Sequence, residues 1–87
     1  MKINEKRLIK IWCRLDNRAR YLDELMVNKN ISDDMFKVWY LEQDRVDKLR
    51  AELMQACGFD DYNEFVSYIL DTGIIKWDDN NSMWEVL

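Results

Sequence analysis

The side chains best suited to chemistry in this chain are two cysteines and several neighbouring carboxylates. The 87 residues include no histidine, the commonest general base near neutral pH. Cys13 and Cys57 both lie within helical apolar patterns, so we expect buried thiols. A structural zinc site needs about four Cys or His ligands, and this chain has two cysteines and no histidine. Carboxylates or a second chain would have to complete such a site. We therefore expect no metal site and no cofactor.

The carboxylates form an oxygen-rich run near the end of the sequence, Asp78-Asp79-Asn80-Asn81-Ser82. A calcium loop also places oxygen ligands at alternate positions, but it needs glycine where Met83 stands here. The run therefore predicts a turn. No nucleophile lies in a recognisable catalytic context and no glycine-rich loop is present to hold a phosphate, so we expect that the protein is not an enzyme.

Charge is distributed unevenly along the chain, although the net charge is only −4. Residues 1–20 carry seven Lys or Arg and two acidic residues, whereas residues 51–87 carry one Lys and eight acidic residues. Such segregation steers a protein towards a charged partner or towards the opposite end of a second copy.

Two long amphipathic helices must position these groups, over residues 5–27 and 33–57, with a short connection that makes them an antiparallel hairpin. The predicted apolar stripe of the first helix is Leu8, Trp12, Leu15, Ala19, Leu22 and Met26. The stripe of the second is Met35, Trp39, Val46, Leu49, Leu53 and Ala56, interrupted by Glu42. In this hairpin Glu42 lies opposite Arg18 and Arg20, and we predict an ion pair with one of them.

A short third helix is predicted over residues 61–72, after a glycine cap at Gly58, and a second glycine cap at Gly73 ends it. Residues 74–87 change to the period of a β-hairpin, in which Trp77 and Trp84 would pair across the strands. We expect a single, mainly α domain over residues 1–87.

The short elements are too small to cover two long helices, so part of the apolar surface should stay open. We expect a second copy to cover it, giving a dimeric four-helix arrangement. Val38, Tyr40 and Leu41 lie off the main stripe and add to this surface. The aromatic residues expected in an exposed patch are Tyr21, Trp39, Tyr40, Tyr68 and Trp84.

These features favour a small, non-enzymatic protein-binding module that regulates or inhibits a larger partner protein. The expected partner-binding residues are Trp77, Trp84, Tyr68, Asp60, Asp61, Glu64 and Asp71. Small inhibitors made by phages have a similar size and composition, which is an analogy only. The sequence shows no signal peptide and no apolar run long enough for a membrane span, so we expect a cytoplasmic protein that binds no membrane.

Two alternatives remain open. A nucleic-acid-associated regulator would use the basic side of the first helix in a dimer, through Arg7, Lys10, Arg14 and Arg18. The third helix is a poor candidate for the same role, because no Lys or Arg occurs from Ala51 to Ile75 and phosphates would repel its carboxylates. A structural subunit of a larger assembly would show open association instead of a closed dimer.

Overall fold

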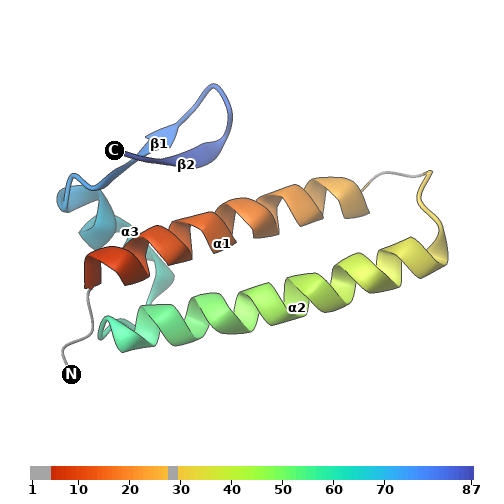
Figure 1. Ribbon diagram of the computed structural model, residues 1–87, viewed down its shortest axis with the longest axis horizontal. Coiled ribbons are helices and arrows are strands. Elements are labelled where there is room, and N and C mark those ends of the chain that lie inside the picture. Colours follow the sequence, from red (N-terminus) through yellow and green to blue (C-terminus); the bar gives the residue numbers. More distant parts are fainter. Residues whose placement is uncertain (1–4, 28–29) are drawn as a thin grey trace.

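The protein is mainly helical, with a two-stranded antiparallel sheet at its C-terminal end (Figure 1). The computed structural model describes residues 5–27 and 30–87. Its elements are α1 (Glu5–Met26), α2 (Asp33–Ala56), α3 (Tyr62–Asp71), β1 (Ile75–Asp78) and β2 (Met83–Val86). This order confirms the predicted helical hairpin, third helix and β-hairpin. Each helix boundary lies within one residue of its prediction.

The helical hairpin is formed by α1 and α2, which run antiparallel along the longest dimension of the molecule (Figure 1). Residues 28 and 29 of the predicted connection lie outside the described residues. Ser32 is the N-cap of α2, because its hydroxyl accepts a hydrogen bond from the Met35 amide at 3.2 Å. Asp33 and Asp34 then occupy the first turn, where the helix dipole favours negative charge.

The turn from α2 to α3 is a Schellman motif centred on Gly58, which confirms the glycine cap predicted at that position. The Phe59 amide donates to the Met54 carbonyl at 3.1 Å, and the Gly58 amide donates to the Gln55 carbonyl at 2.9 Å. Asp61 then caps α3 by accepting from the amides of the second and third helical residues. These local bonds fix where α3 starts relative to the end of α2.

The β-hairpin pairs Trp77 with Trp84, as predicted, and their rings pack edge to face with centroids 5.0 Å apart. Its turn is organised by Asp78, whose carboxylate accepts from the Asn80 amide at 2.9 Å and from the Asn81 side chain at 2.8 Å. The hydrogen bond from Asn81 is the main reason why the pKa of Asp78 is lowered. The oxygen-rich run is therefore a turn, as expected.

In the fold α1 is the central element, with α2 on one side and the β-hairpin on the other (Figure 1). Its buried residues are Ile9, Trp12, Cys13, Asp16, Ala19 and Leu22. The predicted stripe was therefore wrong in part, because Leu8, Leu15 and Met26 are only half-buried. The prediction assumed that α1 packs only against α2. In the structure the buried side of α1 faces α2 and also the layer formed by α3 and the sheet.

The core divides into two clusters along α1. The larger one joins α1 to α3 and the sheet, through Ile9, Trp12, Cys13, Phe65, Ile69, Ile75 and Trp84. The smaller one, of Ala19, Leu22 and Val46, holds the far half of the helical hairpin together. Val46 is the only buried residue of α2, so the predicted burial of Met35, Leu49 and Ala56 was wrong. Within the described residues α2 packs mainly against α1, so apolar side chains on its other sides stay exposed.

Candidate functional site

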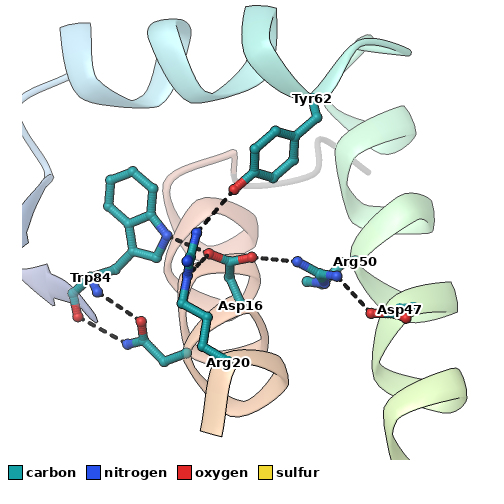
Figure 2. Close-up of polar contacts among 7 residues, drawn as sticks. Asp16, Arg20, Asp47, Arg50, Tyr62 and Trp84 are labelled. Atoms are coloured by element: carbon teal, nitrogen blue, oxygen red, sulfur yellow. Dashed lines mark hydrogen bonds and ion pairs between the residues drawn. The ribbon is translucent and has the colours of Figure 1, made fainter. Parts of the chain in front are cut away.

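The carboxylate of Asp16 lies in the middle of α1, is only 1% exposed and accepts three hydrogen bonds. Figure 2 shows it between side chains from three elements. Arg20 donates to Oδ2 at 3.1 Å from the next turn of α1, and the Trp84 indole donates to the same oxygen at 2.7 Å. Arg50 of α2 donates to Oδ1 and, at 2.6 Å, to Asp47. Asp16 thus ties α2 and the sheet to α1.

The sheet is fastened to α1 at a second point, beside Asp16. The side-chain amide of Asn17 accepts from the Trp84 backbone amide at 2.7 Å and donates to the Trp84 carbonyl at 3.0 Å. Asn17 therefore bonds to the outer edge of β2 as a neighbouring strand would. Trp84 is 5% exposed and belongs to the core. The expectation that it lies in an exposed patch was wrong, because its indole finds a buried acceptor on α1.

Two of the residues that surround Asp16 come from distant parts of the sequence. Its partner Trp84 is 68 positions away, and Arg50 is 34 away. One available signal was Arg20, four residues on, which is the spacing of a helical ion pair. A carboxylate at the i+4 position from Trp12 also lies on the same side of the helix as that buried indole.

Three of the predicted partner-binding residues come together on α3. Glu64, Tyr68 and Asp71 line a shallow groove that is wide open to solvent. We call this surface the α3 groove; its lining residues are Phe59, Asn63, Glu64, Ser67, Tyr68 and Asp71. Asp60 and Asp61 precede α3 and are exposed, but the Asp61 carboxylate is already bonded to the helix amides. The groove is acidic, with aromatic side chains among its carboxylates.

The aromatic part of the α3 groove is held in place by neighbouring elements. Phe59 packs against Tyr68 with ring centroids 4.8 Å apart. The Tyr68 hydroxyl donates to Glu5 of α1 at 2.8 Å. That hydrogen bond to a carboxylate is the main cause that raises the pKa of Tyr68, so the phenol stays protonated and neutral. The groove therefore has a fixed aromatic wall.

Trp77 and Trp84 are not among the residues that line the α3 groove. Trp77 is half-buried on β1, and the guanidinium of Arg20 lies 4.7 Å from its ring centroid. Of the other aromatic residues expected at the surface, Tyr21 and Tyr40 are exposed, whereas Trp39 and Tyr68 are half-buried. The predicted partner-binding set is thus divided between α3 and the sheet.

The basic residues of α1 have a more varied placement than the sequence implied. Arg7, Arg14 and Arg18 are exposed, and Lys10 is half-buried. Arg18 forms a two-point ion pair with Glu42, at 2.9 Å from Nε and 3.1 Å from Nη2. This confirms the predicted pairing across the hairpin, at its exposed edge. This ion pair engages Arg18, one of the four basic residues expected to contact a nucleic acid.

The other surface with unusual chemistry is on α2. Met35, Val38, Leu41 and Leu49 share one side of the helix by their spacing and are all exposed. We call this set the α2 apolar face. Leu41 is 67% exposed and Val38 is 57% exposed, which confirms that they contribute to an open surface. Large apolar side chains exposed on one side of a helix favour a protein interaction site.

Within residues 5–27 and 30–87, no three His, Cys, Asp or Glu side chains are grouped so that they could hold a metal ion. None of the described helices has both the length and the apolarity to cross a membrane. Comparisons with protein families, with curated proteins and with solved structures gave no match for this chain.

Proposed function

We propose that this protein is a non-enzymatic module that binds a larger protein and regulates or inhibits it, as small phage inhibitors do. The observation that supports this is the α3 groove, which gathers Glu64, Tyr68 and Asp71 on one surface. The partner would present a basic surface, because the sequence around the groove carries acidic residues and no Lys or Arg from Ala51 to Ile75.

The chemistry of the groove fits a Lys or Arg side chain well. A carboxylate such as Glu64 or Asp71 binds the charged head, while the rings of Phe59 and Tyr68 contact the aliphatic stem or the guanidinium face. A partner surface that normally binds phosphates is also basic, so it would attract the acidic α3 groove in the same way. The module would then act by occupying a site that a nucleic acid otherwise uses.

The experiment compares charge reversal in the groove with the same reversal elsewhere. Wild-type protein and the double variant Glu64→Lys/Asp71→Lys are used to isolate binding proteins from cells that express the chain. A purified candidate is then titrated at several salt concentrations. We expect the groove variant to lose binding by about a hundredfold or more, since close charge pairs at interfaces contribute several kcal/mol when reversed.

The matched control is Glu52→Lys/Asp79→Lys, which changes the net charge equally at exposed positions outside the groove. It should bind within about threefold of the wild type, the effect expected from long-range charge alone. Equal losses in both variants would contradict a role for the groove. Circular dichroism shows whether both variants keep the helical content of the wild type.

The competing function, nucleic-acid binding through α1, has its own signature in the same titrations. Duplex DNA binding should weaken steeply with salt and disappear in Arg14→Glu/Arg18→Glu. The groove variant would then leave binding unchanged or strengthen it. The ion pair between Arg18 and Glu42 already satisfies one of these charges, so we favour the protein partner.

We also propose that two copies of the chain associate through the α2 apolar face, which extends the helical hairpin into a four-helix arrangement. The support is that α2 buries only Val46 within its own chain, while Val38 and Leu41 are mostly exposed. Pairing of these faces would remove them from water without covering the α3 groove, none of whose lining residues belongs to α2.

The compartment that we propose is the cytoplasm. Cys13 and Cys57 are free thiols in the structure, and cytosolic proteins keep their cysteines in this form.

A further inference from the structure

A pocket of about 380 Å³ lies where α1, α2 and α3 meet, and the proposed partner surface does not include it. Its lining residues are Trp12, Asp47, Arg50, Ala51, Met54 and Tyr62. An apolar cavity of about 150 Å³ is enough to hold benzene, so one substituted aromatic ring or a fused pair fits here. The volume also falls in the range of natural small-molecule sites.

The walls of the pocket are mostly aromatic and apolar. Trp12 belongs to the core and is 1% exposed, and its ring centroid lies 5.8 Å from that of Tyr62 at an interplanar angle of 44°. Ala51 and Met54 form the side that α2 contributes. A flat aromatic ring can stack on the aromatic and thioether side chains that line the pocket.

The polar residues of the pocket are held by contacts with neighbouring side chains. Figure 2 shows Arg50 held between Asp16 and Asp47, and Tyr62 reached by Arg20. The Arg20 Nη2 atom donates to the Tyr62 hydroxyl at 3.4 Å. The positive charges of Arg20 and Arg50 are balanced by the negative charges of Asp16 and Asp47, so a ligand needs no net charge.

The same residues also indicate that a ligand should carry a hydrogen-bond acceptor. The Arg50 Nε atom is the one buried side-chain nitrogen or oxygen in the described part of the chain that has no hydrogen-bond partner. A buried donor without an acceptor is destabilising, so an oxygen that approached Arg50 would be bound favourably.

We infer that this pocket binds a compact, uncharged, planar aromatic molecule with an oxygen acceptor. The test uses benzamide as the probe and toluene as its analogue without the acceptor. Each is titrated into ¹⁵N-labelled protein while NMR follows the Trp12 indole N–H and the Ala51 amide. We expect saturable shifts with benzamide in the millimolar range, which is typical of ligands of this size, and binding of toluene that is about fivefold weaker or more.

A pair of alanine substitutions on α2 tests the location. Ala51→Leu fills the pocket from an exposed helix position and should weaken benzamide binding by about tenfold or more. Ala56→Leu makes the same change on the same helix outside the pocket and should leave binding unchanged. Shifts that do not saturate, or that persist in Ala51→Leu, would overturn the inference. Equal binding of toluene and benzamide would overturn the need for an acceptor.

Discussion

The indole of Trp84 donates a hydrogen bond of 2.7 Å to the buried carboxylate of Asp16, so the last strand of the chain is fastened to the middle of the first helix. The same carboxylate accepts from Arg50 of α2. A single side chain on α1 therefore links the two layers that pack on that helix. Its buried position makes each of these contacts depend on the others.

Asp16→Asn should be the most destabilising single polar substitution in the protein. It removes the buried negative charge that Arg20 and Arg50 share, which leaves Arg50 with only the half-exposed Asp47, at a cost of about 3 kcal/mol. Urea denaturation followed by circular dichroism measures the change. Asp47→Asn is the control, since Asp47 also pairs with Arg50 but is half exposed, and it should cost less than about 1 kcal/mol. Equal effects would refute the central role of Asp16.

Asn17→Ala should loosen the β-hairpin while leaving the helical hairpin intact. Two hydrogen bonds to the Trp84 backbone are lost, which corresponds to about 1–3 kcal/mol in total. Hydrogen exchange at the Trp84 amide is the direct readout, because that N–H loses its acceptor and should exchange faster. Asn63→Ala, at an exposed position of α3, is the comparison and should not alter exchange at Trp84. Unchanged protection in Asn17→Ala would show that the sheet is held mainly by its apolar contacts.

The secondary structure was predictable because its signals are local. Ser32, Gly58 and Asp61 each act through hydrogen bonds to residues at most four positions away, so their types and spacing suffice. The pairing of Trp77 with Trp84 follows from a short turn in the same way. The cross-hairpin pair of Arg18 and Glu42 was also accessible, because an antiparallel hairpin fixes which residues lie opposite.

The orientation of α1 was not predictable from the same signals. Periodicity shows that a helix has an apolar side, but the buried side of α1 depends on two layers that come from later in the sequence. Ile9, Cys13 and Asp16 are buried by α3 and the sheet, a relationship that no window around α1 contains. The α3 groove was partly predictable, since Glu64, Tyr68 and Asp71 are three or four residues apart on one helix. Phe59 joins it only through the turn at Gly58.

Replacement of Gly58 by alanine should destabilise the protein through its backbone alone. Gly58 has φ +88°, in the left-handed region, and an added Cβ would meet no heavy atom within 4 Å. The expected cost is about 1–2 kcal/mol, the penalty for a side chain in that conformation. Gly58→Asn should cost less, because asparagine tolerates this region better. Chemical denaturation of both variants tests the order, and a neutral alanine variant would contradict it.

The free energy of unfolding should fall more steeply at alkaline pH than it would if the Cys13 thiol were exposed. Burial, followed by the nearby Asp16 carboxylate, raises the pKa of Cys13 from 9.0 to about 12. Between these two values the unfolded chain loses the thiol proton while the folded chain keeps it, so the free energy of unfolding decreases as pH rises. Below pH 9 the contribution is complete and constant.

The measurement compares the wild type with Cys13→Ala at several pH values from about 8 to 12. The raised pKa values of Cys57 and Tyr68 act equally in both proteins, so the difference isolates Cys13. We expect the stability advantage of the wild type to shrink as pH rises. A constant difference would show that the Cys13 thiol titrates as an ordinary one.

Self-association should depend on the α2 apolar face and respond to a single charge placed there. Leu41 is 67% exposed and Leu87 is 65% exposed, which makes Leu87→Glu a matched control for Leu41→Glu. Light scattering over a dilution series should give twice the 10.6 kDa chain mass for the wild type and for Leu87→Glu, and one chain mass for Leu41→Glu. Burial of a carboxylate against a second apolar helix is costly, so the variant dissociates. A wild type that remains monomeric at high concentration would contradict dimerisation and leave the face free for a different protein.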